Sequence, residues 1–304
     1  MTAGFEEFDI GPPGGRLHVL RWGAPEPERP AALLSHGTGF CAAVWHDVAV
    51  ALADEFVVYA WDRRGHGASH APADAYHLAD FAEDAVVICE ELDVRNALAV
   101  GHSAGATDLL IAAARRPERL ACVLAIEPTA MNPFEPPDPA PGHDERPLAD
   151  RVTGAVRRRT AFDDIAAVVD RYRGRGIYAS WPEHLLRLYV EHGFGGRADG
   201  SVEIRCRPEH ERIMLNHIFS VMDGTYRGDR RGNPLRELTR LSCPVTVATN
   251  AQSEPVYHHM AAAAMALLPH ATRVEFPGTG HTVAQESPGE VSSAVRSFWS
   301  HRST

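Results

Sequence analysis

The sequence predicts an α/β fold in which a doubly wound, mostly parallel sheet carries an inserted helical cap. Short apolar runs alternate with helix-like stretches as far as residue 126. The alternation stops between residues 129 and 240, and it resumes at residue 244. Parallel strands need a crossover connection, usually a helix, so repeated strand–helix units indicate a sheet that is covered on both faces.

The first half of the chain supplies most of the predicted sheet. Strands are expected where short apolar runs are bounded by Gly, Pro or Asp, at residues 17–20, 31–35, 57–61, 97–100 and 121–126. Helices are expected between or after them, at residues 45–53, 78–92 and 104–115.

Residues 129–240 are predicted to be an insertion. They open with a proline-rich link at Pro133, Pro136, Pro137, Pro139 and Pro141, and continue as helical, polar sequence without a convincing core strand. Beyond them, strands are expected at 245–249 and 273–276, and helices at 257–268 and 288–299. We therefore expect a core domain of residues 1–128 and 241–304, with a helical cap of residues 129–240 over the strand ends where such sheets bind ligands.

Composition excludes several classes of protein. The 304 residues are 44% apolar and carry a formal charge of −10, which argues against a nucleic-acid-binding surface. No window reaches the ~18 apolar residues of a membrane span, and the acidic N-terminal residues do not resemble an export leader. The five cysteines lack disulfide or zinc-ligand spacing. We expect a cytoplasmic protein without a membrane partner, a metal or a cofactor; a homodimer is left open.

The motif Gly-His-Ser-Ala-Gly at residues 101–105 is the strongest chemical signal. It follows a predicted strand and precedes a predicted helix, which is the context of a nucleophile elbow. Flanking glycines permit the sharp turn that exposes the serine hydroxyl beside a helix N-terminus. Ser103 is the predicted nucleophile.

A serine nucleophile needs a base that is itself oriented by a third group. His281, in Gly-Thr-Gly-His-Thr after the last predicted strand, is the predicted base. Two acids remain open as its partner. Glu127 ends the strand at 121–126 and is preferred, because a carboxylate at the end of a buried strand needs a partner. Glu254, shortly after the strand at 245–249, is the alternative.

The loop after the strand at 31–35 fits an oxyanion hole. The backbone N–H groups of Thr38 and Ala104 would hold the charge that develops on the carbonyl oxygen. The turn at residues 62–67 is interpreted as a structural hydrogen-bond knot around Asp62. His102 is expected to pack beneath the elbow, and the arginines at 157–159 are interpreted as a solvated helix face.

With these motifs in this order, the chain resembles the α/β-hydrolase superfamily over nearly its whole length. The match lies at His36-Gly37, at residues 62–67, at the elbow and at Gly280-His281. The resemblance implies a cofactor-free mechanism and a mobile lid. The chain departs from the commonest pattern at Ser253, where many members carry the acid, and so is similar to members that use the Glu127 position.

The expected function is hydrolysis of a carboxylic ester or lactone of a hydrophobic small molecule through an acyl-enzyme. A serine cannot replace the aspartate with which dehalogenases and epoxide hydrolases of this fold form an alkyl ester. Gly39, Phe40, Trp181 and Tyr189 are the predicted substrate-binding residues. Three alternatives stay open: a carbon–carbon bond hydrolase, a thioesterase, and a protein of this fold that only senses a ligand.

Overall fold

A computed structural model describes residues 4–12, 14–26, 28–134 and 146–302. Four of the prolines predicted to form the link into the insertion, Pro136, Pro137, Pro139 and Pro141, lie outside the described residues. Pro133 lies within them, in an irregular stretch that follows the sixth strand.

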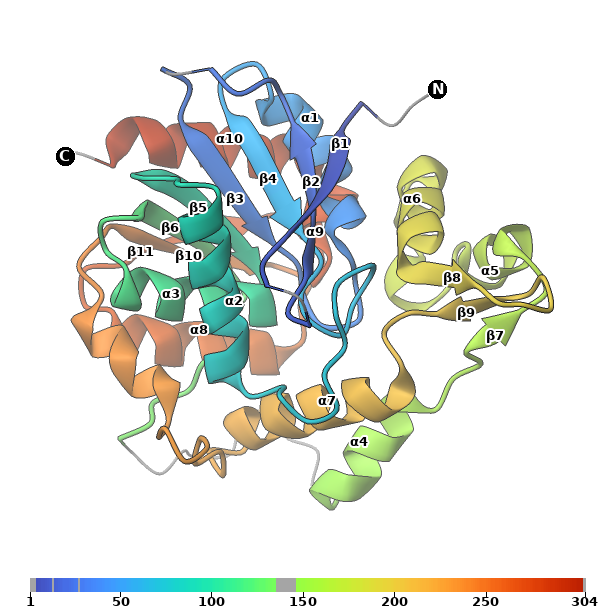
Figure 1. The fold of residues 1–304 in the computed structure, drawn as a ribbon. Coiled ribbons are helices and arrows are strands. Elements are labelled where there is room, and N and C mark those ends of the chain that lie inside the picture. The colour runs from blue at the N-terminus through green and yellow to red at the C-terminus, as the bar shows by residue number, and fades with distance from the viewer. Residues whose placement is uncertain (1–3, 13, 27, 135–145, 303–304) are drawn as a thin grey trace.

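An eight-stranded sheet forms the centre of the molecule, with the order β1-β2-β4-β3-β5-β6-β10-β11. Only β1–β2 and β2–β4 pair antiparallel, and every other neighbouring pair is parallel. The predicted doubly wound, mostly parallel sheet is confirmed (Figure 1). The strands are β1 (Glu6–Ile10), β2 (Leu17–Trp22), β3 (Ala31–Ser35), β4 (Val57–Trp61), β5 (Ala97–His102), β6 (Leu120–Ile126), β10 (Val245–Asn250) and β11 (Thr272–Phe276).

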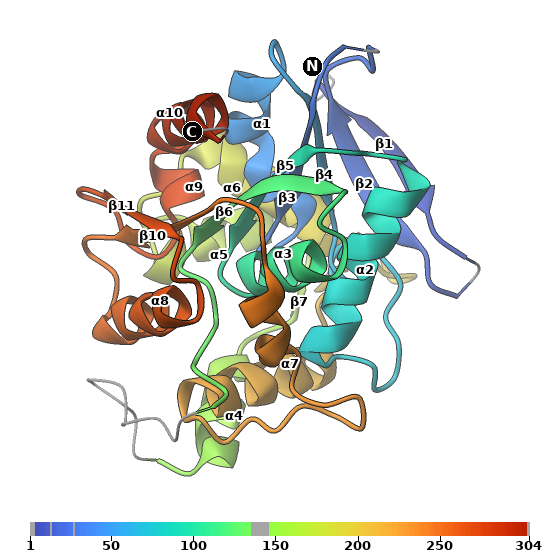
Figure 2. The ribbon, with the colours of Figure 1, turned by 90° about the vertical axis from the view of Figure 1, so that its left-hand side faces the viewer.

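Helices cover both faces of this sheet. Along β3, Leu33 packs into one apolar cluster with α2, α3 and α8, whereas its neighbour Leu34 packs into a second cluster with α1 and α10. The strict alternation of a strand's side chains between the two faces produces this division. Figures 1 and 2 show the two helical layers. Their elements are η1 (Ala42–Trp45), α1 (His46–Leu52), α2 (Leu78–Glu91), α3 (Ala104–Arg115), α8 (Pro255–Leu267), α9 (Val283–Glu286) and α10 (Pro288–His301).

The insertion connects β6 to β10, which are neighbours in the sheet. Its described residues, up to 134 and from 146 onward, form four α-helices, as its polar helical pattern predicts, and they lie beside and below the sheet in Figure 1. It also forms a small antiparallel sheet of order β7-β9-β8, which the sequence did not predict because runs of two or three residues show no periodicity. Its elements are α4 (Leu148–Val156), β7 (Ala161–Phe162), α5 (Ile165–Tyr172), η2 (Gly176–Tyr178), α6 (Glu183–Gly193), β8 (Phe194–Gly196), β9 (Val202–Ile204), α7 (Pro208–Met222) and η3 (Pro234–Arg240).

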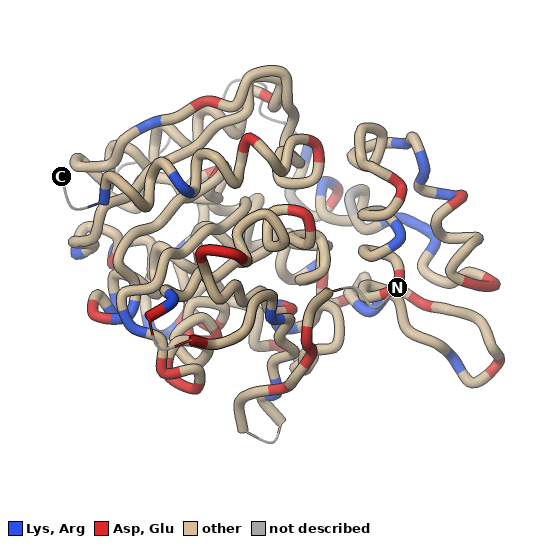
Figure 3. The backbone as a smooth tube through the Cα atoms, turned by 90° about the horizontal axis from the view of Figure 1, so that it is seen from above, with Lys and Arg blue, Asp and Glu red and all other residues tan. Residues whose placement is uncertain are grey.

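Charged residues are distributed over the whole molecule. Figure 3 shows acidic and basic residues interspersed along the core and the insertion. Within the described ranges, none of the helices combines the length and the apolar character that crossing a membrane would require.

Candidate active site

The predicted nucleophile lies on a sharp turn between β5 and α3. Ser103 has φ 55° and ψ −124°, a conformation that costs a non-glycine residue about 1–3 kcal/mol, and its N–H donates to the Ile126 carbonyl at 2.8 Å. A Cβ on Gly101 would lie 2.3 Å from the Ala106 Cα. A Cβ on Gly105 would lie 2.5 Å from the Ser35 carbonyl oxygen. Both flanking glycines are therefore required by close packing of the strands and the helix.

Glu127 follows β6 immediately and is completely buried. Its N–H donates to the Ala248 carbonyl at 2.9 Å, and its Oε1 accepts the Asn250 N–H at 3.0 Å. Its Oε2 lies 2.6 Å from His281 Nδ1. The two carboxylate oxygens thus each have a polar partner, which offsets the cost of burying the charge. Glu254, the alternative acid, is exposed at the start of α8, so the structure pairs His281 with Glu127.

His281 lies in the loop between β11 and α9. Its ring stacks on Tyr257 at a centroid distance of 3.9 Å and lies 4.5 Å from the His102 ring. Glu286 holds the loop on both sides of the histidine, since it accepts hydrogen bonds from the Gly280 N–H and the Thr282 hydroxyl. With Nδ1 donating to Glu127, Nε2 is left as the unprotonated nitrogen that a general base needs.

The loop at residues 37–39 passes over the nucleophile. A Cβ on Gly37 would lie 3.3 Å from the Ser103 Cβ, so the backbone approaches to contact distance. The Gly39 N–H is already used, because it donates to His66 Nε2 at 3.0 Å. Among the described residues, the N–H groups of Thr38 and Ala104 find no hydrogen-bond partner. These two donors are therefore open to an oxyanion.

Buried polar groups support this loop from behind. Arg63 donates from Nε to Asp108 Oδ2 at 2.7 Å, from NH1 to the Thr38 hydroxyl at 3.2 Å, and from its backbone N–H to His36 Nε2 at 3.0 Å. Burial raises the pKa of Asp108 to about 6, although Arg63 opposes the shift. Burial also lowers the pKa of His66 to about 3, so its ring is neutral and can accept the Gly39 N–H.

The knot predicted around Asp62 is present. Its carboxylate accepts the N–H groups of Ala42 at 2.7 Å and Ala68 at 2.8 Å, and a Cβ on Gly67 would lie 1.9 Å from the same carboxylate. His102 is buried beside the elbow, and burial holds its pKa well below the usual range. Its ring lies against the rings of Phe40 and His281, at centroid distances of 6.2 and 4.5 Å.

The four predicted substrate-binding residues come together at this site. The Phe40 ring lies 5.5 Å from Trp181 and 5.9 Å from Tyr189, and the Tyr189 hydroxyl donates to the Gly39 carbonyl at 3.0 Å. Trp181 Nε1 donates to the Thr282 hydroxyl at 3.1 Å, directly beside His281. The insertion therefore contacts both the loop at 37–40 and the histidine loop.

An ion pair at the same loop was not predicted. Arg158 donates from NH1 to Glu211 Oε1 at 2.9 Å, and that oxygen lies 3.3 Å from the position of a Cβ on Gly39. Burial raises the pKa of Glu211, and Arg158 opposes the rise. The interpretation of residues 157–159 as a solvated face is wrong for Arg158, which turns inward because Glu211 on α7 is buried and needs a cation.

Comparison with known proteins settles the family. Residues 32–294 match the model of the Alpha/beta hydrolase family. The chain belongs to this family. One curated relative of this hydrolase is the 2-(acetamidomethylene)succinate hydrolase of Mesorhizobium japonicum, which is 30% identical over 88% of this chain and 87% of that protein. An epoxide hydrolase of Caballeronia sordidicola is 36% identical, but over only 41% of this chain and 38% of that protein.

Solved structures of α/β hydrolases agree with the fold. The crystal structure of an E-2-(acetamidomethylene)succinate hydrolase superimposes with a TM-score of 0.78, at 26% identity, covering 97% of this chain and 99% of that one. A thioesterase domain from the curacin biosynthetic pathway superimposes with a TM-score of 0.73 at 21% identity, covering 96% of this chain and 99% of that one, and shows the fold alone. The protein is a hydrolase of the α/β family; these relatives differ in the bonds that their names describe.

Proposed function

We propose that this hydrolase cleaves acyl compounds through an acyl-enzyme on Ser103. The observation that carries the proposal is the 2.6 Å contact between His281 Nδ1 and the buried carboxylate of Glu127. Glu127 directly follows β6, the neighbour of the strand that ends at the nucleophile. A buried carboxylate in this position fixes the tautomer of the histidine and stabilises the imidazolium that forms during catalysis.

The proposed cycle has two half-reactions, acylation and deacylation, and in each of them His281 acts first as a base and then as an acid. His281 takes the hydroxyl proton as Ser103 attacks the carbonyl carbon, and the N–H groups of Thr38 and Ala104 stabilise the oxyanion. His281 then protonates the leaving group. Water, activated by the same histidine, hydrolyses the acyl-enzyme and releases the acid.

The nucleophile separates this chain from one of its relatives. Opening an epoxide on this fold proceeds through an alkyl ester, which forms on an aspartate at the elbow. Because residue 103 is serine, the partial similarity to an epoxide hydrolase does not extend to that chemistry. Acyl transfer is the reaction that a serine supports here.

We propose a carboxylic ester or lactone of a hydrophobic molecule as the substrate. Phe40 and Trp181 support this choice, because both aromatic rings lie close to the elbow and the histidine loop. Phe40 stacks on His102, next to Ser103, at a centroid distance of 6.2 Å, and Trp181 bonds to Thr282, the residue after His281. Tyr189 is only 2% exposed and holds the Gly39 carbonyl, so its proposed role is to shape the pocket wall.

A second candidate substrate is an acylated amine that carries carboxylates. The relative that covers 88% of this chain is named for 2-(acetamidomethylene)succinate, which has an acetamido group and two carboxylates. Arg158 is a cation 27% exposed beside the loop at 37–39, but both of its terminal nitrogens already pair with Glu211, so a substrate carboxylate would have to share its guanidinium. The name of this relative supports an acylated amine as a second candidate, and the thioester and carbon–carbon alternatives stay open.

The test compares three substrate classes on one preparation: p-nitrophenyl esters of increasing acyl length, a series of lactones, and 2-(acetamidomethylene)succinate. We expect turnover of at least one class and complete loss of it in Ser103→Ala. Ser292→Ala is the matched control, because it removes a buried hydroxyl from α10, outside the site. A wild-type protein that turns over none of the three and does not react with an organophosphonate probe would refute the proposal and leave a ligand sensor. Preference for the succinate derivative would replace the ester by the amide.

A further inference from the structure

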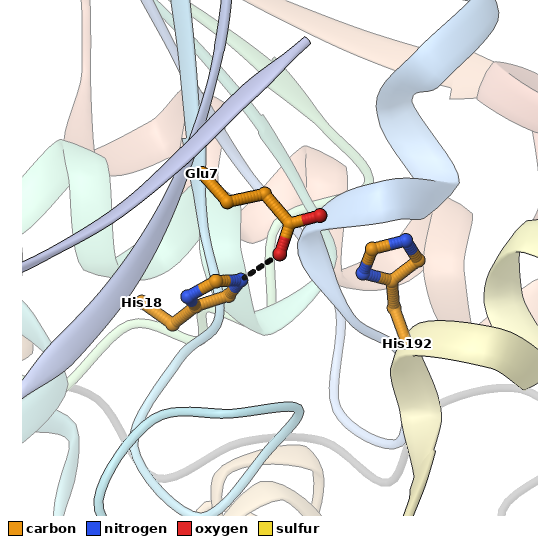
Figure 4. Close-up of side chains that lie close together, drawn as sticks. All are labelled: Glu7, His18 and His192. Carbon is orange, nitrogen blue, oxygen red and sulfur yellow. Dashed lines mark ion pairs between the residues drawn. The ribbon is translucent and has the colours of Figure 1, made fainter. Parts of the chain in front are cut away.

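Two histidines and a glutamate meet on the side of the sheet that carries β1. Glu7 lies on β1, His18 on β2 and His192 near the end of α6 in the insertion. One potential ligand atom from each lies within 4.8 Å of the other two. Figure 4 shows the Glu7 carboxylate between the two imidazole rings. None of the three residues takes part in the proposed acyl transfer.

The hairpin arranges two of these residues and their support. In the β1–β2 register Asp9 is directly opposite His18, and Glu7 is two residues away on the same face. His18 Nε2 lies 3.3 Å from Glu7 Oε2, and His18 Nδ1 lies 3.3 Å from Asp9 Oδ1. The His18 ring is thus held between two carboxylates.

The third residue comes from the docking of α6 on this face. The Phe5 ring lies 5.5 Å from the His192 ring and 5.1 Å from Trp22 of β2, so an apolar contact fixes the end of the helix against the hairpin. A second link between α6 and the core is the contact of His184 Nε2 with Asp47 at 2.9 Å. The cluster therefore spans the boundary between the core sheet and the insertion.

These groups match the ligand preferences of a zinc-type cation. Two imidazole nitrogens and one carboxylate oxygen form the protein part of many open, four-coordinate zinc sites, in which water takes the remaining position. Zinc-bound histidines usually donate their second nitrogen to a carboxylate, and Asp9 is placed for that role toward His18. With metal–ligand distances near 2.0–2.1 Å, ligand atoms of a tetrahedral site are about 3.4 Å apart. The three ligand atoms, which lie within 4.8 Å of one another, would have to approach to this spacing when the ion binds. The side chain of Glu7 is 48% exposed and therefore has room to rotate toward the ion.

We propose that Glu7, His18 and His192 bind a divalent transition-metal ion, represented by Zn²⁺, which ties α6 of the insertion to the N-terminal hairpin. The composition gave no sign of this site, and no metal was expected, because its residues are 11 and 174 positions apart and include no cysteine. The alternative is a simple ion pair between Glu7 and His18, with His192 nearby by packing alone.

The test is a zinc titration of the full chain after dialysis against a chelator, with a chromophoric chelator as competitor. We expect one site whose affinity falls about 100-fold or more in His192→Ala and in Glu7→Gln, and about 10- to 100-fold in Asp9→Asn. His270→Ala is the control, since it removes an exposed histidine of the core outside the cluster, leaves both contacts that hold α6 in place, and should leave the affinity unchanged. Circular dichroism without metal checks that each variant is folded, and His192→Gln replaces the alanine variant if that one is not.

A second readout does not depend on affinity. Zinc should raise the Tm of the wild type and of His270→Ala, but not that of His192→Ala, because a ligand that binds only the native state stabilises it. Anomalous scattering at the zinc edge from loaded crystals should place the ion between the three side chains. Absence of zinc binding in the wild type, or equal affinity in the wild type and His192→Ala, would overturn the proposal; neither result bears on the esterase assay.

Discussion

Replacement of Glu127 by glutamine is the sharpest test of the proposed triad. The substitution keeps the volume and keeps an oxygen that can accept the Asn250 N–H, now at 3.0 Å from Oε1. It removes the negative charge beside His281 and points an amide N–H₂ at Nδ1, where the wild type has an acceptor at 2.6 Å. Two donors then face each other, and the imidazole must rotate or adopt the other tautomer.

The magnitude follows from this geometry. A contact of 2.6 Å between Nδ1 and Oε2 puts the two charge centres about 4 Å apart when the imidazolium forms. At an effective dielectric constant of about 20, that attraction is about 4 kcal/mol, which corresponds to about a thousandfold in rate. The wrong tautomer adds to this loss, so we expect kcat to fall by about 10³- to 10⁴-fold.

The assay is steady-state hydrolysis of whichever substrate the wild type turns over, with kcat and KM measured separately. KM should change little, because Glu127 is completely buried and does not reach the substrate. Glu254→Gln is the control: it removes an exposed carboxylate at the start of α8 and should lower kcat less than threefold, on the order of the effect of a distant surface charge. Retention of more than a tenth of wild-type kcat by Glu127→Gln would refute the assignment of the acid.

Three further predictions test the surroundings of the site. His66→Gln keeps a hydrogen-bond acceptor but no longer titrates. Because the pKa of His66 is about 3 in the folded protein and about 6.5 in the unfolded chain, the free energy of unfolding of the wild type falls as the pH drops below 6.5. Urea denaturation at pH 6 and pH 4.5 should show that this fall is smaller in the variant, by up to about 1.4 kcal/mol per pH unit. Asp108→Asn should destabilise the protein by about 3–5 kcal/mol in the same assay, since it leaves the Arg63 cation buried without its counter-charge; a loss below 1 kcal/mol would contradict this. Trp181→Phe keeps one aromatic ring but removes part of a buried side chain together with the N–H that bonds to Thr282, so kcat/KM should fall about fivefold and the Tm should fall as well. An unchanged kcat/KM would show that this bond does not position the histidine loop.

Much of the sheet is predictable because its strands are buried on both faces. The strand at 57–61 is apolar throughout, and in the structure all five of its residues are buried. β1 was missed for the opposite reason. Its sequence, Glu-Glu-Phe-Asp-Ile, is that of an exposed edge strand: three of its five residues are charged, none is fully buried, and the alternation of apolar and charged residues covers only four positions, too few to identify a strand.

For the site, too, residues marked by local sequence could be predicted, whereas residues placed by distant contacts could not. Ser103, His281 and Glu127 could be selected because each stands directly after a strand, or after the turn that follows one, and parallel strands end at one edge of the sheet. The inward turn of Arg158 and the burial of Asp108 could not be predicted. Both depend on partners that are 53 and 45 residues away in the sequence, on elements whose packing no local pattern specifies.

The backbone conformations of Ser103 and Glu127, which the sequence does not show, also support the proposed site. In the part of the chain that the structure describes, four residues other than glycine have positive φ: Asp93, Asn96, Ser103 and Glu127. Asp and Asn tolerate the left-handed region and occur there in ordinary turns. Ser103 and Glu127 do not share that tolerance, yet they follow adjacent strands, β5 and β6, and are the two residues proposed as nucleophile and acid. Unfavourable conformations persist where the surrounding structure enforces them, and they concentrate at functional sites. The pairing of this strain across two neighbouring strand ends is therefore independent support for a triad that uses Glu127.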